Sequence, residues 1–109
     1  MILIQLFLLN FKKKTKRLKI GFVSGDFGYH SVGFFLINIL SNINFQKFEL
    51  FAYSNSSRND ELTKKIKSKF HHWNLIAGKK NLDVINKIRR DGIHILFDLS
   101  GHTAKNRLV

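Results

Sequence analysis

The 109-residue chain has no cysteine and no proline, and it carries only 7 acidic residues against 19 lysines and arginines. The absence of cysteine excludes disulfides, thiolate metal sites and a cysteine nucleophile. It also removes any sign of an oxidising compartment, so we expect a cytoplasmic protein. With 44% hydrophobic and 24% charged residues, the composition is that of one ordinary globular domain, and the chain is too short for several.

The basic excess gives a formal net charge of +12 and an isoelectric point near 10.3. Such a charge favours a polyanionic partner, because lysine and arginine release counterions when they contact phosphates. The lysines are nevertheless spread along the whole chain, whereas nucleic-acid-binding proteins usually concentrate charge on one helix or stripe. A small basic α/β nucleic-acid-binding module is therefore the alternative function, and nucleic acid is the less favoured partner.

Residues 1–16 consist of an apolar run, MILIQLFLLNF, and a basic stretch. The run is shorter than the ~20 apolar residues of a membrane-spanning helix, and a secretory signal has its positive charges before the apolar region. No membrane span is predicted. We interpret residues 1–16 as an extension: the end of a preceding helix, a helix lying on a surface, or sequence outside the fold. Residues 17–109 form the predicted folded region.

From residue 17 onward, short apolar runs alternate with helical patterns, which is typical of a parallel sheet flanked by helices. Helices are predicted to begin near Ser31, after Asp60 and at Asn81, with Ser31 and Asn81 as caps. The first helix is apolar around most of its circumference, so we expect it to be largely buried. The fold class is a Rossmann-like α/β sheet. Its strands are predicted near residues 18–23, 48–53, 73–76 and 93–99.

Right-handed crossovers between parallel strands bring every strand-to-helix loop to the same edge of the sheet, which is the default ligand site. The loops contribute hydroxyl, amide, carboxylate and imidazole groups. The polar rim expected at this edge contains Ser24, Gly25, Asp26 and His30, then Ser54 and Asn55, and finally Ser100, Gly101, His102 and Thr103.

His30 stands where the first helix begins, and each rim residue has two interpretations. A neutral imidazole there could take a proton from a hydroxyl, but a histidine at a helix entrance is more often a cap or a packing residue. Asp26 could orient an imidazole or a sugar hydroxyl, or it could stabilise the turn before Gly28. His102 either lines an acceptor pocket or caps the end of its strand. The loop glycines do not make a dinucleotide or P-loop motif.

The other histidines give weaker signals. His71 and His72 are not spaced as in an H-E-x-x-H zinc site. His94 falls inside the predicted last strand, where we expect it to pack or to form a hydrogen bond. Trp73 and the many phenylalanines lie within apolar runs, which favours core positions over a stacking platform for bases.

Three ordered blocks, KRLKIGFVSGDFGYHSVGFF, FELFAYSNS and DGIHILFDLSGHTAKNRL, resemble the catalytic region of the protein O-GlcNAc transferase and SPINDLY-like glycosyltransferase family. The resemblance covers residues 17–109. Ser31 stands where the family usually has proline, which leaves the helix entrance less restricted. The matching motif residues are Ser24, Asp26, Phe27 and His30, then Asp91, Gly92, Ile93, Asp98, Gly101, Thr103, Asn106 and Arg107.

The resemblance implies the N-terminal part of a two-lobed B-type glycosyltransferase. In such an enzyme a Ser or Thr hydroxyl of a protein acceptor attacks the anomeric carbon of UDP-GlcNAc with inversion. The resemblance implies that His30 is the catalytic base, that Asp26, Gly101, His102 and Thr103 bind substrate, and that no metal or other cofactor takes part. The donor-binding lobe has no counterpart in these 109 residues. We therefore expect a partial lobe that is inactive alone and whose partner would be a separate chain carrying the donor lobe.

Overall fold

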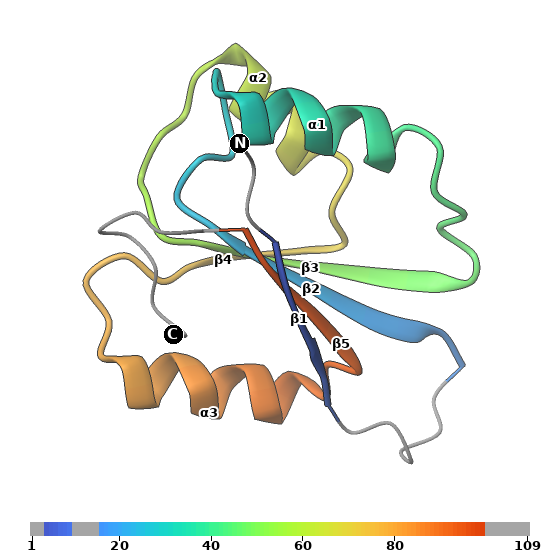
Figure 1. Ribbon diagram of the computed structural model, residues 1–109, viewed down its shortest axis with the longest axis vertical. Helices are drawn as coiled ribbons and strands as arrows, with labels where there is room; N and C mark the ends of the chain where they lie inside the picture. The colour runs from blue at the N-terminus through green and yellow to red at the C-terminus, as the bar shows by residue number, and fades with distance from the viewer. Residues whose placement is uncertain (1–3, 10–15, 100–109) are drawn as a thin grey trace.

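The computed structural model describes residues 4–9 and 16–99, which form a five-stranded sheet between two layers of helices (Figure 1). The expected α/β class is confirmed. The elements in chain order are β1 (Gln5–Leu8), β2 (Leu18–Ser24), α1 (Ser31–Leu40), β3 (Phe48–Ser54), α2 (Glu61–Lys67), β4 (His72–Leu75), α3 (Asn81–Asp91) and β5 (Ile95–Asp98).

The strand order is β1-β5-β2-β3-β4, and every neighbouring pair is parallel except β1 with β5. The chain therefore moves outward from β2 through β3 to β4, and α3 then carries it back to β5 on the other side of β2. The direction in which strands are added therefore reverses at the β2–β5 boundary, which makes this boundary a topological switch point. In open α/β sheets, ligands bind outside the carboxyl ends of the strands at such a point.

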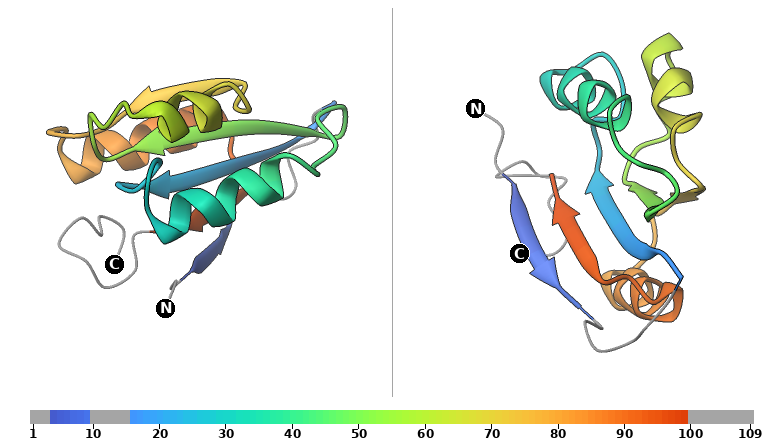
Figure 2. Two further views of the ribbon diagram at one scale, coloured as in Figure 1. Left: turned by 90° about the horizontal axis from the view of Figure 1, so that it is seen from above. Right: turned by 90° about the vertical axis from the view of Figure 1, so that its right-hand side faces the viewer.

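The reversal also explains the two helical layers. Right-handed crossovers in opposite directions place their helices on opposite faces, so α1 and α2 cover one face and α3 covers the other (Figure 2). Alternate side chains of β2 follow this division. Ile20 and Phe22 belong to the core under α1 and α2, whereas Val23 belongs to the core under α3.

The N-terminal run differs from what we expected. Its residues 5–8 form neither a helix nor sequence outside the fold, because β1 pairs antiparallel with β5, with Gln5 opposite Asp98 and Leu8 opposite Ile95. A short apolar run is compatible with a helix or a strand, and the pairing partner decides between them. Within the described residues, none of the helices has the length and apolar character that crossing a bilayer requires.

Helix α1 is less buried than its composition suggested. Val32, Gly33, Leu36 and Leu40 are buried, but Phe34 is 55% exposed, and Phe35 and Ile39 are also exposed. The expectation of a largely buried helix was wrong because α1 meets the sheet and α2 only on one side. The apolar residues on its other sides have no neighbouring layer among the described residues.

Helix α3 begins one residue earlier than predicted, since Lys80 is its N-cap and Asn81 is already helical. Its other end was predicted correctly. Gly92 has φ 74°, the left-handed conformation that favours glycine after a helix. His94 follows, 2% exposed, and its Nδ1 accepts a hydrogen bond from the backbone N of Lys19 at 2.9 Å, which confirms the packing role expected for it.

Candidate active site at the carboxyl edge of the sheet

The candidate site lies at the carboxyl ends of β2 and β5. Val23 is opposite Asp98 in the register, and the backbone N of Leu99 donates to the backbone O of Val23 at 2.8 Å. The loops that follow these two strands therefore start next to each other at one edge. The structure thus supports the geometry of the predicted rim as far as residue 99. Ser100, Gly101, His102 and Thr103 lie outside the described residues.

The first loop, residues 25–30, is held by a compact turn. The Oγ of Ser24 accepts a hydrogen bond from the backbone N of Asp26 at 2.9 Å, and the backbone N of Gly28 donates to the backbone O of Asp26 at 2.9 Å. Because Ser24 is completely buried, its hydroxyl is committed to this turn. Asp26 is half-buried. The Ser24 side chain thus performs the turn-stabilising task that we had considered for the side chain of Asp26, which takes part in this turn through its backbone N and O.

The second loop contributes structure rather than reactive groups. The backbone N of Asn55 donates to the backbone O of Ser24 at 2.8 Å, which ties the ends of β2 and β3 together. The buried hydroxyl of Ser54 donates to the backbone O of Ser56 at 2.9 Å. The hydroxyl groups of the two serines that end these strands are therefore engaged in hydrogen bonds within their own loops.

His30 is the N-cap of α1, so the expectation that Ser31 caps this helix was wrong. The backbone of His30 is extended, with φ −162° and ψ 156°, and its Nδ1 accepts a hydrogen bond from the backbone N of Val32 at 3.2 Å. The residue itself is exposed. Ser31 begins the helical turn. The cap is the second of the two roles that the sequence left open for His30.

Asp60 fixes the position of the first loop, and we had assigned it only a helix-start role. One oxygen of its carboxylate accepts from the backbone N of Thr63 at 2.8 Å and from the Thr63 hydroxyl at 2.9 Å. The other accepts from the backbone N of Tyr29 at 3.1 Å, next to His30. Desolvation opposes ionisation, but the Thr63 and Tyr29 hydrogen bonds and the charge of Arg58 outweigh it and hold the pKa of Asp60 below its ordinary value of 3.8.

Two glycines let the loop and α1 approach closely. A Cβ added to Gly33 would lie 1.8 Å from the backbone O of Gly28. A Cβ added to Gly28 would lie 2.5 Å from the Cδ of Arg58 and 2.7 Å from a carboxylate oxygen of Asp60. The first turn of α1 therefore rests directly on the loop backbone, and this contact sets the position of His30.

Asp98 belongs to the same edge, although we had not assigned it a site role. Its side chain is completely buried at the end of β5, opposite Val23 on one side and Gln5 on the other. The sequence does carry a signal for it. In IHILFDL, an aspartate stands two residues after the buried Leu96, on the same face of an otherwise apolar strand.

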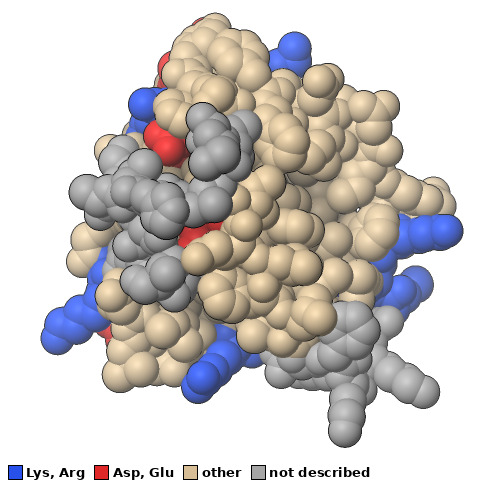
Figure 3. Space-filling model, viewed as in Figure 1, with Lys and Arg blue, Asp and Glu red and all other residues tan. Residues whose placement is uncertain are grey.

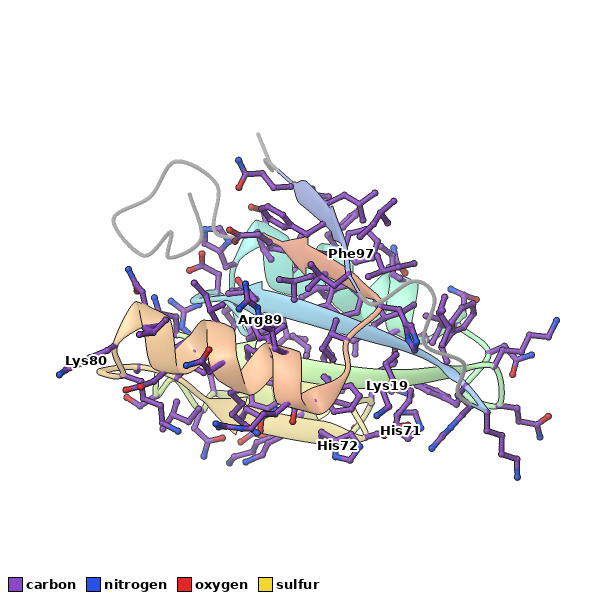
Figure 4. All side chains as sticks on the ribbon, turned by 90° about the horizontal axis from the view of Figure 1, so that it is seen from below. Lys19, His71, His72, Lys80, Arg89 and Phe97 are labelled. Carbon is purple, nitrogen blue, oxygen red and sulfur yellow. The ribbon has the colours of Figure 1, made fainter. Side chains whose placement is uncertain are left out.

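A second polar cluster lies at the other end of the sheet. Figure 4 shows His71, His72 and Lys19 at the end opposite Lys80, which starts α3. The Nε2 of His72 lies 2.6 Å from the Oε2 of Glu49, and Nη2 of Arg17 lies 3.7 Å from the Oε1 of Glu49. This cluster joins the starts of β2, β3 and β4 and takes no part in the rim.

Glu49 gives the amino-end cluster a pH dependence. Burial raises the pKa of Glu49, but the His72 hydrogen bond and charge, with the charges of Arg17 and Lys19, outweigh burial and hold this pKa below its ordinary 4.5. A carboxyl with a lowered pKa stabilises the fold above its unfolded-state value and loses that contribution as the pH falls through the folded-state value. Above about pH 4.5, the free energy of unfolding should therefore be higher for wild type than for Glu49→Gln. The two values should converge at lower pH.

Urea denaturation of the two chains across this pH range checks the prediction. Glu61→Gln is the matched control, since Glu61 pairs with Lys64 on the exposed surface of α2. A wild-type advantage over Glu49→Gln that persisted undiminished under strongly acidic conditions would contradict the assignment.

A groove of about 190 Å³ lies between α3 and the β1–β5 edge, away from His30. Its lining is mostly apolar, and Arg89 contributes the charged group. The residues that line it are Phe7, Leu9, Ile85, Ile88, Arg89 and Leu96. Among the described residues, none of those that line the groove belongs to the rim.

Comparison with known proteins gives a consistent result. The family model described as Glycosyl transferase family 41 matches residues 5–108. A protein of Arabidopsis thaliana described as "Probable UDP-N-acetylglucosamine--peptide N-acetylglucosaminyltransferase SPINDLY" is 32% identical over 103 residues, covering 91% of this chain and 11% of that protein. A Caenorhabditis elegans protein described as "UDP-N-acetylglucosamine--peptide N-acetylglucosaminyltransferase" is 32% identical over 97 residues, covering 85% of this chain and 8% of that protein.

Among solved structures, a mutant of the O-GlcNAc transferase from Thermobaculum terrenum matches with a TM-score of 0.68 and 33% sequence identity. The match covers 72% of this chain and 15% of that chain. The chain thus spans roughly a tenth of the length of the curated relatives that it matches.

Proposed function

Because this chain belongs to glycosyl transferase family 41, we propose that it forms part of an enzyme that transfers GlcNAc from UDP-GlcNAc to Ser or Thr hydroxyls of proteins. The names of the relatives support this donor and this acceptor class. The observation that carries the proposal is the switch point between β2 and β5. It brings the loop of Asp26 and His30 and the end of β5 to the same edge, where an open α/β sheet binds its ligands.

The proposal assigns the chain to the acceptor side of the reaction. Asp26, His30, Gly101, His102 and Thr103 would face the acceptor and the transferred sugar, and transfer would invert the anomeric carbon. The family resemblance implies a second lobe that binds the donor, and the developing charge on the UDP phosphates would be stabilised in that lobe rather than by the described rim residues Asp26 and His30. We therefore expect that a polypeptide of these residues alone transfers no measurable GlcNAc.

A chimera tests the proposal. Residues 17–109 would replace the matching segment of the Thermobaculum terrenum O-GlcNAc transferase, and transfer from UDP-GlcNAc to a Ser-containing peptide would be measured. We expect transfer by the chimera and a strong loss in its His30→Ala variant. The control variant is His94→Ala, whose imidazole packs at the opposite end of the sheet. A chimera that folds, as shown by its thermal melting, and transfers no sugar would contradict the proposal.

The charge of the chain does not favour the nucleic-acid alternative. On the face shown in Figure 3, lysine and arginine side chains are spread around the outline rather than gathered over one element. Filter binding of a random oligonucleotide at two salt concentrations checks this point. A counterion-driven complex would weaken steeply as the salt concentration rises, whereas we expect little binding at either concentration.

A further inference from the structure

The sheet ends at β1, and the outer edge of this strand is unprotected. β1 is the first strand in the order β1-β5-β2-β3-β4, so it pairs on one side only. Proteins usually protect an edge strand with a charged side chain, a proline or a bulge. Residues 4–9 read IQLFLL, without charge or proline, and β1 pairs with β5 in unbroken register. This edge is therefore suited to pairing with a further strand.

The backbone groups that face the open edge can be identified. The backbone N of Leu9 donates to the backbone O of His94 at 2.6 Å, so Leu9 directs its N–H toward β5. In an antiparallel pair, alternate residues direct both backbone groups to the partner strand, and the residues between them direct theirs away. Phe7 therefore faces β5 as Leu9 does. Leu6 and Leu8 present their N–H and C=O groups at the open edge.

The side chains of the same two leucines are exposed on one face of the sheet. Leu6 is opposite Phe97 in the register, and Phe97 packs against the core under α1 and α2. Leu8, two residues further along the strand, lies on the same face. Leu6 is 56% exposed and Leu8 is 62% exposed, although both are fully apolar. The two helices on this face therefore leave the part over β1 uncovered.

Helix α1 continues this apolar surface above the strand. Its Phe34 shares a hollow with Leu62 of α2, whereas Phe35 and Ile39 line a groove to which no described residue of α2 contributes. Both views in Figure 2 show α1 between α2 and the β1 side of the sheet. Phe35 and Ile39 are therefore on the β1 side of the helix. The edge surface consists of Ile4, Leu6, Leu8, Phe35 and Ile39, which are five of the nine large apolar side chains exposed among the described residues.

We propose that the edge surface joins two copies of this chain, with β1 of one copy antiparallel to β1 of the other. A two-fold axis brings the same surface of both copies together, and antiparallel pairing of a strand with its own copy has this symmetry. The outward backbone groups of Leu6 and Leu8 then form hydrogen bonds with those of the second copy. The axis is perpendicular to the joined sheet, so Phe35 and Ile39 of both copies lie on one face of it.

The distribution of charge favours a second copy in this orientation. A net charge of +12 opposes self-association unless the positive groups are kept apart. The basic stretch KKKTKR, residues 12–17, follows the carboxyl end of β1 in the sequence. Antiparallel pairing directs the two basic stretches to opposite ends of the joined strands, whereas parallel pairing would bring them together. On the face shown in Figure 3, lysine and arginine side chains lie at the outline and leave the middle uncharged.

Sedimentation equilibrium of the complete chain tests the proposal. We expect the wild type to reach twice the 12.7 kDa mass of one chain as its concentration rises. Leu6→Lys places a charge in the interface and should remain at the mass of one chain. The matched control is Leu82→Lys, because Leu82 is an equally apolar residue, 66% exposed, on α3. Urea denaturation verifies that both variants fold.

Three outcomes would overturn the proposal. They are a wild type that keeps the mass of one chain up to its solubility limit, a Leu82→Lys variant that dissociates as strongly as Leu6→Lys, and assemblies that grow beyond two copies. The last would mean that the edge joins strands without the closure that a two-fold axis gives.

Amide hydrogen exchange of the wild type gives a second test that needs no folded variant. At a concentration about ten times the dissociation constant, exchange at Leu6 and Leu8 should be about tenfold slower than in dilute solution. Exchange at Phe7, whose N–H already faces β5, should change much less. A dimer in which Leu6 and Leu8 exchange as fast as in dilute solution would show that the copies meet elsewhere. Neither test involves sugar transfer, so its result is independent of the proposed function.

Discussion

Replacing Gly33 with alanine is expected to lower the free energy of unfolding by about 3 kcal/mol or more. The new Cβ would stand 1.8 Å from the backbone O of Gly28, and the two nearest atoms after it are also Gly28 backbone atoms. Because no flexible side chain can move aside, either α1 or the loop must shift. The total stability of a domain of this size is about 5–15 kcal/mol, so much of it would be lost. Urea denaturation measures the change.

The matched control is Gly78→Ala. Gly78 has φ 81°, which is unfavourable for alanine, but no atom lies within 4 Å of an added Cβ. This variant should cost about 1–2 kcal/mol from backbone conformation alone. If Gly33→Ala cost no more than Gly78→Ala, the close approach of α1 to the loop would not be the contact that positions this helix.

Replacing Leu36 with alanine should destabilise the fold by about 2–5 kcal/mol. Leu36 is completely buried on the sheet side of α1, within the core that includes Ile20 and Phe22 of β2. Removal of its side chain forfeits the transfer free energy and leaves a cavity that a close-packed interior fills only in part. The effect should appear as a lower urea midpoint with an unchanged slope.

Phe34→Ala, on the same helix, provides the comparison. Phe34 is 55% exposed and touches the ring of Tyr29 at a centroid distance of 6.0 Å. Since little of its surface leaves water on folding, the expected cost is about 1 kcal/mol or less. A loss for Phe34→Ala equal to that for Leu36→Ala would mean that the outer face of α1 is covered in solution.

Local patterns predicted the strands and helices from residue 17 onward well, because each of these elements buries apolar residues at its own period. The turn at Gly92 was predicted because glycine favours the left-handed conformation after a helix. The packing of His94 was predicted because this histidine lies within an apolar run. Right-handed crossovers then fix the edge to which Asp26 and His30 belong. That part of the site needs no information from distant contacts.

The features that were missed depend on partners far away in the sequence. The apolar run became β1 only because β5, some ninety positions later, offers it an edge. Asp60 looks like an ordinary helix cap, and its second carboxylate oxygen finds Tyr29 only in the folded state. Whether His30 or Ser31 caps the helix depends on the position that the loop gives to each side chain. The conformation of the loop depends in turn on Asp60 and Gly28.

The pairing of β1 with β5 has a consequence for biosynthesis. Gln5 leaves the ribosome long before Asp98, the residue opposite it, so residues 5–8 must wait until some ninety further residues have been made before they can join the sheet. Contacts between such distant segments form slowly, and unpaired apolar strands invite aggregation in the meantime. Nascent chains of this protein should therefore depend on chaperones until β5 emerges.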